Sequence, residues 1–214
     1  MPAHDHLDAA KQRMLDRHLR ARGITDERVL AAMERVRREE FVPEPLRPHA
    51  YDDRALPVEL GQTISQPYTV AFMAQAAQLR GHERVLEIGT GTGYGAAVLS
   101  HLAAEVFSIE RWPDLFDSAT QRLERLGFHN VVTKLGDGSQ GWAELSPFDA
   151  IVVTAAAEQL PTAFLDQLAA GGRIIIPIGE PGRDQTMFRF TRSNGELREE
   201  SLGKFSFVPL VGDS

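Results

Sequence analysis

Short apolar runs alternate with helix-forming segments across the middle of the chain, and this alternation restricts the fold more than any other feature. The segments between the runs predict helices near residues 94–102, 113–126 and 161–168. The runs themselves show little polar alternation, as expected of strands that are covered on both faces. Repeated strand, helix and strand predict an α/β fold with a doubly wound, mostly parallel sheet. The expected strands are 84–88, 105–109, 131–135, 148–154 and 172–178.

The segment before this core has a different character. Helical spacing of apolar residues predicts a helix over about 5–22 that ends at Gly23, and a second helix capped by Thr25. Four prolines exclude a long helix from residues 41–60, which we interpret as an irregular connector. A further apolar helix is expected after Pro67.

The end of the chain predicts antiparallel strands. Residues 185–191 and a segment that ends in Phe-Val-Pro-Leu are β-prone, and Asn194-Gly195 between them is a hairpin signal. The same Asn-Gly pair is prone to deamidation, because glycine leaves the following amide accessible. We expect one domain, with a helical segment and active-site loop (1–80), a ligand-binding core (81–180) and C-terminal strands (181–214).

The composition excludes several kinds of chemistry. The chain has no cysteine, which excludes disulfides, thiolate metal sites and a cysteine nucleophile. Its seven histidines are scattered, so no metal site is expected. A net charge of −7 without a basic face argues against nucleic acid as a partner. No run resembles a signal peptide or a membrane span, so we expect a cytoplasmic protein that binds no membrane.

A glycine-rich turn follows the first expected core strand. Sheets of this kind bind ligands beyond the carboxyl ends of their strands, and Gly89, Gly91 and Gly93 let the backbone approach a ligand closely. The spacing Gly91-x-Gly93-x-x-Ala96 also fits the loose dinucleotide pattern of a nicotinamide enzyme. Glu87 opposes that interpretation, because its carboxylate would repel a pyrophosphate. The same charge favours S-adenosylmethionine, which carries an ammonium, a sulfonium and no phosphate.

Acidic residues also follow the next two expected strands. Glu110 ends the second strand, where a carboxylate can accept hydrogen bonds from both hydroxyls of a ribose in either cofactor. Asp137-Gly138 follows the third strand and is placed to reach an adenine edge, although a plain Asp-Gly turn also explains this pair. Acids and glycines at successive strand ends together predict an S-adenosylmethionine site.

Seven stretches of the chain, in their order, are characteristic of a known family. They are GQTISQPYTVAFM, VLEIGTGTGYGAAVLS, VFSIER, GDG, PFDAIVVTAAA, LAAGGRIIIPIG and FVPL. Over nearly its whole length the chain resembles the protein-L-isoaspartate O-methyltransferases in their bacterial form. The glycine turn is shared by many methyltransferases, whereas the Thr-Ile-Ser-x-Pro segment combined with the closing Phe-Val-Pro-Leu is far more specific.

The resemblance implies a fold and an activity. Members have the class I adenosylmethionine-dependent methyltransferase fold, here with an N-terminal helical segment and an antiparallel C-terminal hairpin. They transfer a methyl group from S-adenosylmethionine to the free carboxylate of L-isoaspartyl residues, leaving S-adenosylhomocysteine and using no metal. The ester can recyclise to a succinimide and reopen, so the implied partners are damaged proteins and peptides.

The resemblance also implies roles for the matching residues. Ser65 matches the active-site serine of the family. Departures from the animal members at Tyr68, Thr69, Val70 and Val211 leave the peptide preference open. The implied substrate contacts are Gln62, Thr63, Ile64, Val208, Pro209, Leu210 and Val211. The implied cofactor contacts are Glu87, Gly89, Thr90, Gly91, Gly93, Glu110, Asp137 and Gly138.

The absence of a catalytic base in the sequence agrees with this chemistry. A substrate carboxylate with a pKa of about 4 is ionised at neutral pH and is already the nucleophile. Ser65 is then a hydrogen-bond donor that orients one carboxylate oxygen, and it is not a covalent nucleophile. An alternative role for Ser65 is that of a helix N-cap before Pro67.

Other functions compete with repair of isoaspartyl damage. One is a carboxyl methyltransferase specific for an aspartate in one peptide partner, and another is an S-adenosylmethionine-binding module without catalysis. The dinucleotide oxidoreductase is more distant. We expect a monomer, because protein substrates need open access to the cleft.

Overall fold

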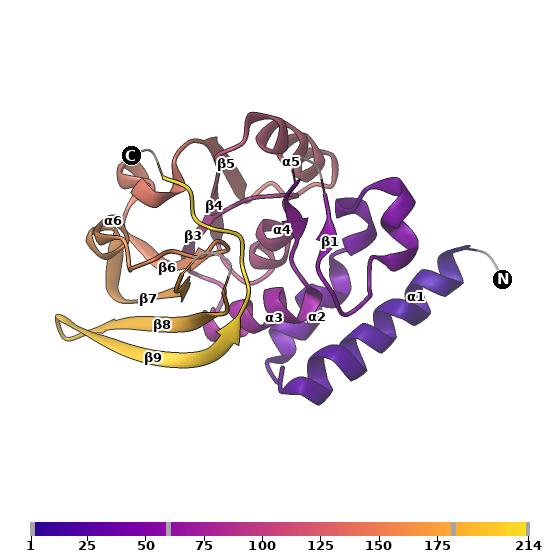
Figure 1. The fold of residues 1–214 in the computed structure, drawn as a ribbon, viewed down its shortest axis with the longest axis horizontal. Coiled ribbons are helices and arrows are strands. Elements are labelled where there is room, and N and C mark those ends of the chain that lie inside the picture. Colours follow the sequence, from indigo (N-terminus) through magenta and orange to yellow (C-terminus); the bar gives the residue numbers. More distant parts are fainter. Residues whose placement is uncertain (1–2, 59–60, 181–182, 213–214) are drawn as a thin grey trace.

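A central sheet of seven strands runs through the structure, a computed structural model that describes residues 3–58, 61–180 and 183–212 (Figure 1). In chain order its strands are β3 (Arg84–Ile88), β4 (Glu105–Glu110), β5 (Val131–Leu135), β6 (Phe148–Val153), β7 (Leu168–Ile178), β8 (Gln185–Ser193) and β9 (Glu196–Phe205). Across the sheet the order is β5-β4-β3-β6-β7-β8-β9. The first five strands are parallel, and β8 and β9 are antiparallel. The predicted mostly parallel sheet with an antiparallel end is confirmed.

Both faces of the middle strands of the sheet are buried, because alternate residues of these strands belong to two hydrophobic clusters. In β3, Val85 packs into one cluster and Leu86 into the other, as the two-residue period of a strand requires. The first cluster also contains residues of α3 (Pro67–Ala76), α4 (Tyr94–Ser100) and α5 (Pro113–Arg125). The second lies under α6 (Thr162–Asp166), whose Phe164 is fully buried. Burial on both faces explains why the runs are apolar throughout.

The N-terminal helix is continuous in the chain but changes its winding. It begins as α1 (Ala3–Arg13), continues as a π-helical stretch over Met14–Leu19 and ends as a 3₁₀ turn over Arg20–Arg22. Gly23 ends it at φ 93°, a left-handed conformation that favours glycine, as predicted.

The second helix, α2 (Glu27–Arg35), begins one residue later than expected. Asp26 is its N-cap, and the Asp26 carboxylate accepts hydrogen bonds from the backbone N–H groups of Arg28 (2.9 Å) and Val29 (3.3 Å). The predicted cap at Thr25 is therefore wrong. The backbone N–H of Thr25 instead donates to the side-chain oxygen of Gln75 in α3 (2.8 Å), a contact between helices that local sequence does not reveal.

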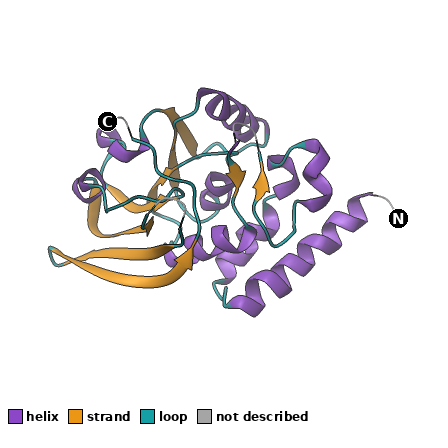
Figure 2. Ribbon diagram, viewed as in Figure 1, coloured by secondary structure: helices purple, strands orange, loops and turns teal. Residues whose placement is uncertain are grey.

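The proline-rich connector contains more regular structure than expected. Two 3₁₀ helices cover Arg38–Phe41 and Glu44–His49. A short strand, β1 (Leu56–Pro57), then pairs antiparallel with β2 (Thr63–Ile64). Figure 2 shows this pair among the helices, apart from the main sheet. The pairing fixes the backbone of the Thr-Ile-Ser segment.

The last two strands form the predicted hairpin. Asn194 (φ 52°) and Gly195 (φ 83°) make a two-residue turn between the paired residues Ser193 and Glu196. Left-handed φ angles at both turn positions are the geometry that Asn-Gly favours. β7 begins at Leu168, earlier than the expected 172, so the helix expected over 161–168 is shortened to α6.

In the described parts of the chain, no helix combines the length and the apolar character that are needed to cross a membrane.

The corrected helix cap gives a test of stability. We expect Asp26→Ala to lower the free energy of unfolding by about 1 kcal/mol, because two backbone N–H groups lose their acceptor. Thr25→Ala, next to it, should change this free energy by less than about 0.5 kcal/mol. Urea denaturation of both variants measures the difference. Equal destabilisation by the two changes would contradict the assignment of the cap.

Candidate active site

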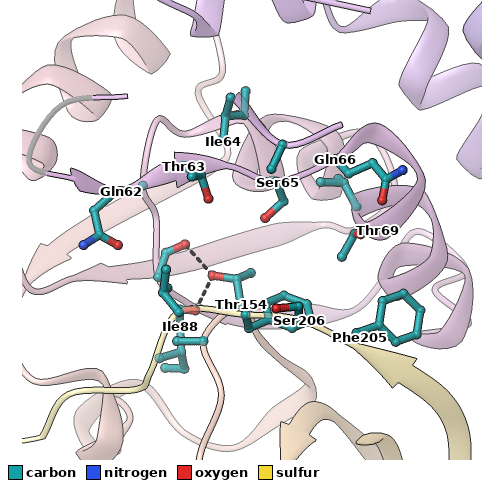
Figure 3. A pocket seen from close by; sticks show the side chains of 18 of the residues that line it. Gln62, Thr63, Ile64, Ser65, Gln66, Thr69, Ile88, Thr154, Phe205 and Ser206 are labelled. Atoms are coloured by element: carbon teal, nitrogen blue, oxygen red, sulfur yellow. Dashed lines mark hydrogen bonds between the residues drawn. The ribbon is translucent and has the colours of Figure 1, made fainter. Parts of the chain in front are cut away.

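One large cleft, of about 950 Å³, lies at the carboxyl ends of the central strands. Three parts of the chain supply most of its lining: the segment from Gln62 to Phe72, the ends of β3, β4 and β6 with the turns that follow them, and the residues from Leu202 to Val211. Figure 3 shows the first and last of these on opposite sides of the cavity.

The glycine turn forms one wall of the cleft, and its first glycine, Gly89, has no space for a side chain. Gly89 adopts φ 96°, and a Cβ atom there would collide with the hydroxyl of Thr154. That hydroxyl is held by the carbonyl oxygens of Ile88 and Gly89, each 2.9 Å away (Figure 3). Thr154 was not among the predicted site residues, although it ends the expected strand 148–154 at the ligand-binding edge. Its position at the carboxyl end of a core strand is the sequence signal that could have identified it as a site residue.

Glu87 is buried beneath the turn in a chain of hydroxyl groups. It is 1% exposed, and Ser108 Oγ donates to Glu87 Oε2 (2.6 Å) while also lying 2.6 Å from Thr90 Oγ1. A Cβ at Gly95 would collide with Glu87 Oε1, so the first turn of α4 closes over the carboxylate. Glu87 and Thr90 both line the cleft.

The protonation of Glu87 depends on what the cleft contains. Burial raises the pKa of Glu87 to about 8, the hydrogen bond from Ser108 acts against this shift, and the charge of Glu110 adds to it. The carboxyl group is therefore mostly protonated at neutral pH when no ligand is present. A cation in the cleft would lower this pKa, because an opposite charge favours the ionised form.

Glu110 ties the glycine turn to the end of β4. Its Oε2 accepts a hydrogen bond from the N–H of Gly91 (2.7 Å), and its Oε1 accepts from the N–H groups of Arg111 (2.8 Å) and Trp112 (3.0 Å). The residue is 5% exposed and lines the cleft. A carboxylate has about four lone-pair sites and three are used here, so Glu110 Oε2 can still accept from a ligand hydroxyl.

Two of the predicted cofactor residues do not line the cleft. Gly93 (φ 88°) packs against Leu123 and begins α4, so it shapes the turn from behind. The Asp137 carboxylate accepts from the N–H of Ser139 (2.8 Å) and caps a short 3₁₀ turn. This bond matches the plain-turn explanation of the Asp-Gly pair. Gly138 does line the cleft, as do Gly89 and Gly91.

The Thr-Ile-Ser segment forms the opposite wall. Ile64 is 3% exposed and anchors the segment in the core, whereas Thr63 is exposed. The hydroxyl of Ser65 points into the cavity (Figure 3) and has no hydrogen-bond partner among the described residues. The N-cap of α3 is Gln66, followed by Pro67 in the first turn, so the alternative role of Ser65 as the cap is wrong.

The C-terminal segment is pinned beside the end of β6. Ala156 donates from its N–H to the carbonyl of Val208 (2.8 Å) and accepts from the N–H of Leu210 (2.7 Å). Arg111 donates to the carbonyl of Val211 (3.1 Å). All four predicted residues from Val208 to Val211 line the cleft together with Gln62, Thr63, Ile64 and Ser65. The structure thus brings both predicted substrate segments to one cavity.

A row of aromatic rings forms part of the lining of the cleft. The ring centroids of Tyr68 and Phe72 are 5.8 Å apart, and those of Phe72 and Phe205 are 4.9 Å apart. The guanidinium of Arg22 lies 3.7 Å from the centroid of the Tyr68 ring. All four residues line the cleft and were missed as site residues. The i, i+4 spacing of Tyr68 and Phe72 in an expected helix was a signal for that pair alone.

Within the described residues, no group of three or more His, Asp or Glu side chains is arranged to hold a metal ion.

Known proteins with similar sequences and structures come from one family. Residues 9–214 match the family model described as Protein-L-isoaspartate(D-aspartate) O-methyltransferase (PCMT). A Marinobacter nauticus protein named Protein-L-isoaspartate O-methyltransferase 2 is 53% identical over 208 residues, 97% of this chain and 95% of the relative. A Protochlamydia amoebophila protein-L-isoaspartate O-methyltransferase is 50% identical over 200 residues, 93% of this chain and 95% of the relative.

A solved structure matches most of the chain as well. It is a crystal structure of a Plasmodium falciparum protein, assigned as a protein-L-isoaspartate O-methyltransferase, in complex with S-adenosyl-L-homocysteine. The TM-score is 0.81 at 28% sequence identity, and the match covers 94% of this chain and 97% of the other.

The buried carboxyl of Glu87 predicts a dependence of stability on pH. Between about pH 4.5 and about pH 8 the folded protein holds a proton on Glu87 that the unfolded chain has lost. This group therefore makes stability fall as pH rises through that window, by up to about 1.4 kcal/mol per pH unit. Urea denaturation of ligand-free parent and Glu87→Gln proteins across the window measures it.

The difference in unfolding free energy between the parent and Glu87→Gln should decrease with rising pH. Glu105→Gln is a matched control, because Glu105 is exposed at the other end of β4. If the difference between the parent and Glu87→Gln stays constant across the window, the protonated state of Glu87 is refuted.

Proposed function

The chain belongs to the protein-L-isoaspartate(D-aspartate) O-methyltransferase family, and from this membership and the cleft we infer what its residues do. It is an S-adenosylmethionine-dependent enzyme that methylates the free carboxylate of L-isoaspartyl residues in damaged proteins and peptides. The ester that it forms can recyclise to a succinimide and reopen. The observation that carries the assignment of residues is that the Thr-Ile-Ser segment and the acidic glycine turn line one cleft.

The cleft suits a cationic nucleoside as methyl donor. S-adenosylmethionine, when bound, supplies a methyl group on a positively charged sulfur. We propose that Glu87 lies near its cationic part, that the backbone of Gly89, Thr90 and Gly91 contacts it, and that Glu110 accepts from its ribose. In support, neither Gly89 nor Gly95 has space for a Cβ atom, and the buried Glu87 has no cationic partner among the residues that the structure describes.

The remaining predicted cofactor residues have more indirect support. Gly138 lines the cleft, and we propose that it borders the adenine. Asp137 and Gly93 do not line the cleft, and we propose that they hold the backbone of their turns in place.

The Ser65 hydroxyl is proposed to donate a hydrogen bond to the substrate carboxylate. The hydroxyl points into the cavity and no described residue engages it, so it is available to a ligand. The carboxylate is already ionised and needs no general base. What the protein supplies is alignment of two reactants and exclusion of water, which can contribute up to about 7–11 kcal/mol of barrier reduction.

The peptide is proposed to lie along the C-terminal segment. The carbonyl of Val208 and the N–H of Leu210 both bond to Ala156. The carbonyl of Pro209 therefore lies on the other edge of the segment, where an extended peptide can pair. Recognition of the main chain would accept many damaged sequences. The aromatic row of Tyr68, Phe72 and Phe205 is proposed to receive an apolar side chain that flanks the lesion.

The whole chain is proposed to act as one domain, as a monomer in the cytoplasm, without nucleic acid or membrane as partner. The cleft takes lining residues from 1–80, 81–180 and 181–214, which supports one functional unit. A net charge of −7 supports the exclusion of nucleic acid.

A pair of peptides tests the substrate assignment. We expect the enzyme to transfer labelled methyl groups from S-adenosylmethionine to an isoaspartyl peptide and not to its aspartyl twin, because the acceptor must present its carboxylate from a displaced main chain. Scintillation counting of methyl esters measures this. Methylation of the aspartyl twin alone would favour the competing aspartate-specific enzyme.

Removal of the Ser65 hydroxyl tests its role in orienting the acceptor. We expect Ser65→Ala to fold normally and to lower kcat/KM for the isoaspartyl peptide by about 1–3 kcal/mol, roughly 5- to 150-fold, as for one charged hydrogen bond. Ser201→Ala, on the exposed face of β9, is the matched control and should keep the parent rate. If Ser65→Ala keeps the parent kcat/KM, the proposed hydrogen bond from Ser65 to the substrate is refuted.

A further inference from the structure

The cleft contains a cation that the proposed reaction does not use. Arg22 is the last residue of the 3₁₀ turn that ends the N-terminal helix, and it lines the cleft. Two acids of the lining, Glu87 and Glu110, belong to the wall that is proposed to hold the methyl donor. Arg22 instead lies against Tyr68, in the aromatic row that is proposed to receive a side chain of the peptide.

Contacts within the protein fix the orientation of the Arg22 guanidinium. Its central carbon lies 3.7 Å from the centroid of the Tyr68 ring, so one face of the group is stacked. Arg22 Nη1 donates to both carboxylate oxygens of Asp53 (3.0 and 3.2 Å). Asp53 is held in turn by the side-chain nitrogen of Gln66 (2.7 Å). A guanidinium fixed in this way loses little conformational freedom when it binds a ligand.

The rest of the guanidinium is open. Arg22 Nε and Nη2 have no hydrogen-bond partner among the described residues, and the side chain is 41% exposed. These two nitrogens form one edge of the group, and such an edge binds a carboxylate through two parallel hydrogen bonds. Arg22 can therefore bind a second carboxylate while it keeps its contact with Asp53.

The aromatic row sets the distance between Arg22 and a bound peptide. The ring centroids of Tyr68 and Phe72 are 5.8 Å apart, and those of Phe72 and Phe205 are 4.9 Å apart. The row is thus about as long as three residues of extended chain, at about 3.4 Å per residue. A peptide with an apolar side chain among these rings brings a residue close to Arg22 within that length.

We propose that Arg22 is a specificity-determining residue that binds an acidic side chain of the substrate, close in sequence to the isoaspartate. The inference rests on the proposed function and names the class of its substrates: damaged segments that carry an aspartate or glutamate near the lesion. With a net charge of −7 the protein as a whole repels acidic peptides, so a local cation is needed to accept them.

A panel of isoaspartyl peptides tests the preference. Each pair differs only by Glu or Gln at one, two or three positions before or after the isoaspartate, and both termini are blocked. At one or more of these positions we expect the parent enzyme to prefer the Glu peptide about fivefold in kcat/KM, as for a partly exposed ion pair. The preference should appear in KM and not in kcat, and it should weaken with added salt.

Arg22→Gln should bring the ratio of the two kcat/KM values to about one. The ratio does not depend on how much of the variant folds, because both peptides are assayed with the same preparation. Arg20→Gln is the matched control: Arg20 belongs to the same 3₁₀ turn, pairs with Asp16 and Glu27, and lies outside the lining.

A second control removes another cation of the cleft. Lys204 also lines it, and its Nζ donates to the hydroxyl of Thr186 (2.8 Å). Both Arg20→Gln and Lys204→Gln should keep the parent ratio. Loss of the ratio in either control would mean that general charge, and not Arg22, produces the preference, and would overturn the proposal.

The remaining outcomes separate this proposal from the proposed function. A parent ratio of about one at every position, or an undiminished ratio in Arg22→Gln, would overturn the role of Arg22 and leave it a packing residue at the start of α3. A lower kcat for both peptides with an unchanged ratio would do the same. Failure of the parent enzyme to methylate any of the isoaspartyl peptides would overturn the proposed function itself, and this proposal with it.

Discussion

The carboxylate of Glu110 receives three backbone N–H groups, and the shape of the cleft depends on this interaction. One of the donors is Gly91, in the turn after β3, and the others follow Glu110 in the chain. The bonds therefore join the ends of two neighbouring parallel strands at the edge where ligands bind. With the turn held in this way, Gly89 lies against Thr154 at the end of β6. The ends of β3, β4 and β6 together form one wall of the cleft.

A second carboxylate gives that wall its electrostatic character. Glu87 lies beneath the turn, where the hydroxyl of Ser108 is its hydrogen-bond partner among the described residues, and burial raises its pKa to about 8. A cation entering the cleft would favour ionisation, whereas a phosphate would not. A buried carboxyl of this kind favours a cationic ligand over an anionic one, which agrees with the proposed contact between Glu87 and the methyl donor.

The acceptor side is built from segments that are far apart in the chain. The Thr-Ile-Ser segment is fixed by the small β1–β2 pair, and the C-terminal segment is fixed by its pairing with Ala156. The rings of Phe72 and Phe205 join the two segments in the lining of the cleft. In the proposed mechanism the substrate carboxylate is already ionised, so the contribution of the protein is the rigid placement of these two segments.

The sequence by itself determined the sheet, the hairpin, the glycine turn and the family. These depend on local signals: apolar runs, Asn-Gly at a turn, and glycines at positions with left-handed φ. Tertiary structure alone decided the roles that depend on distant partners. Asp26 and not Thr25 caps α2, and the N–H of Thr25 bonds to Gln75 instead. Gln66 and not Ser65 holds the N-cap position of α3, so the Ser65 hydroxyl has no partner among the described residues. The Asp137 carboxylate accepts from the N–H of Ser139. The aromatic row could not be predicted, because Phe205 meets Phe72 only after β9 has joined the edge of the sheet. Backbone preferences act between neighbours in the chain, whereas a side chain bonds to whatever the completed fold brings within reach.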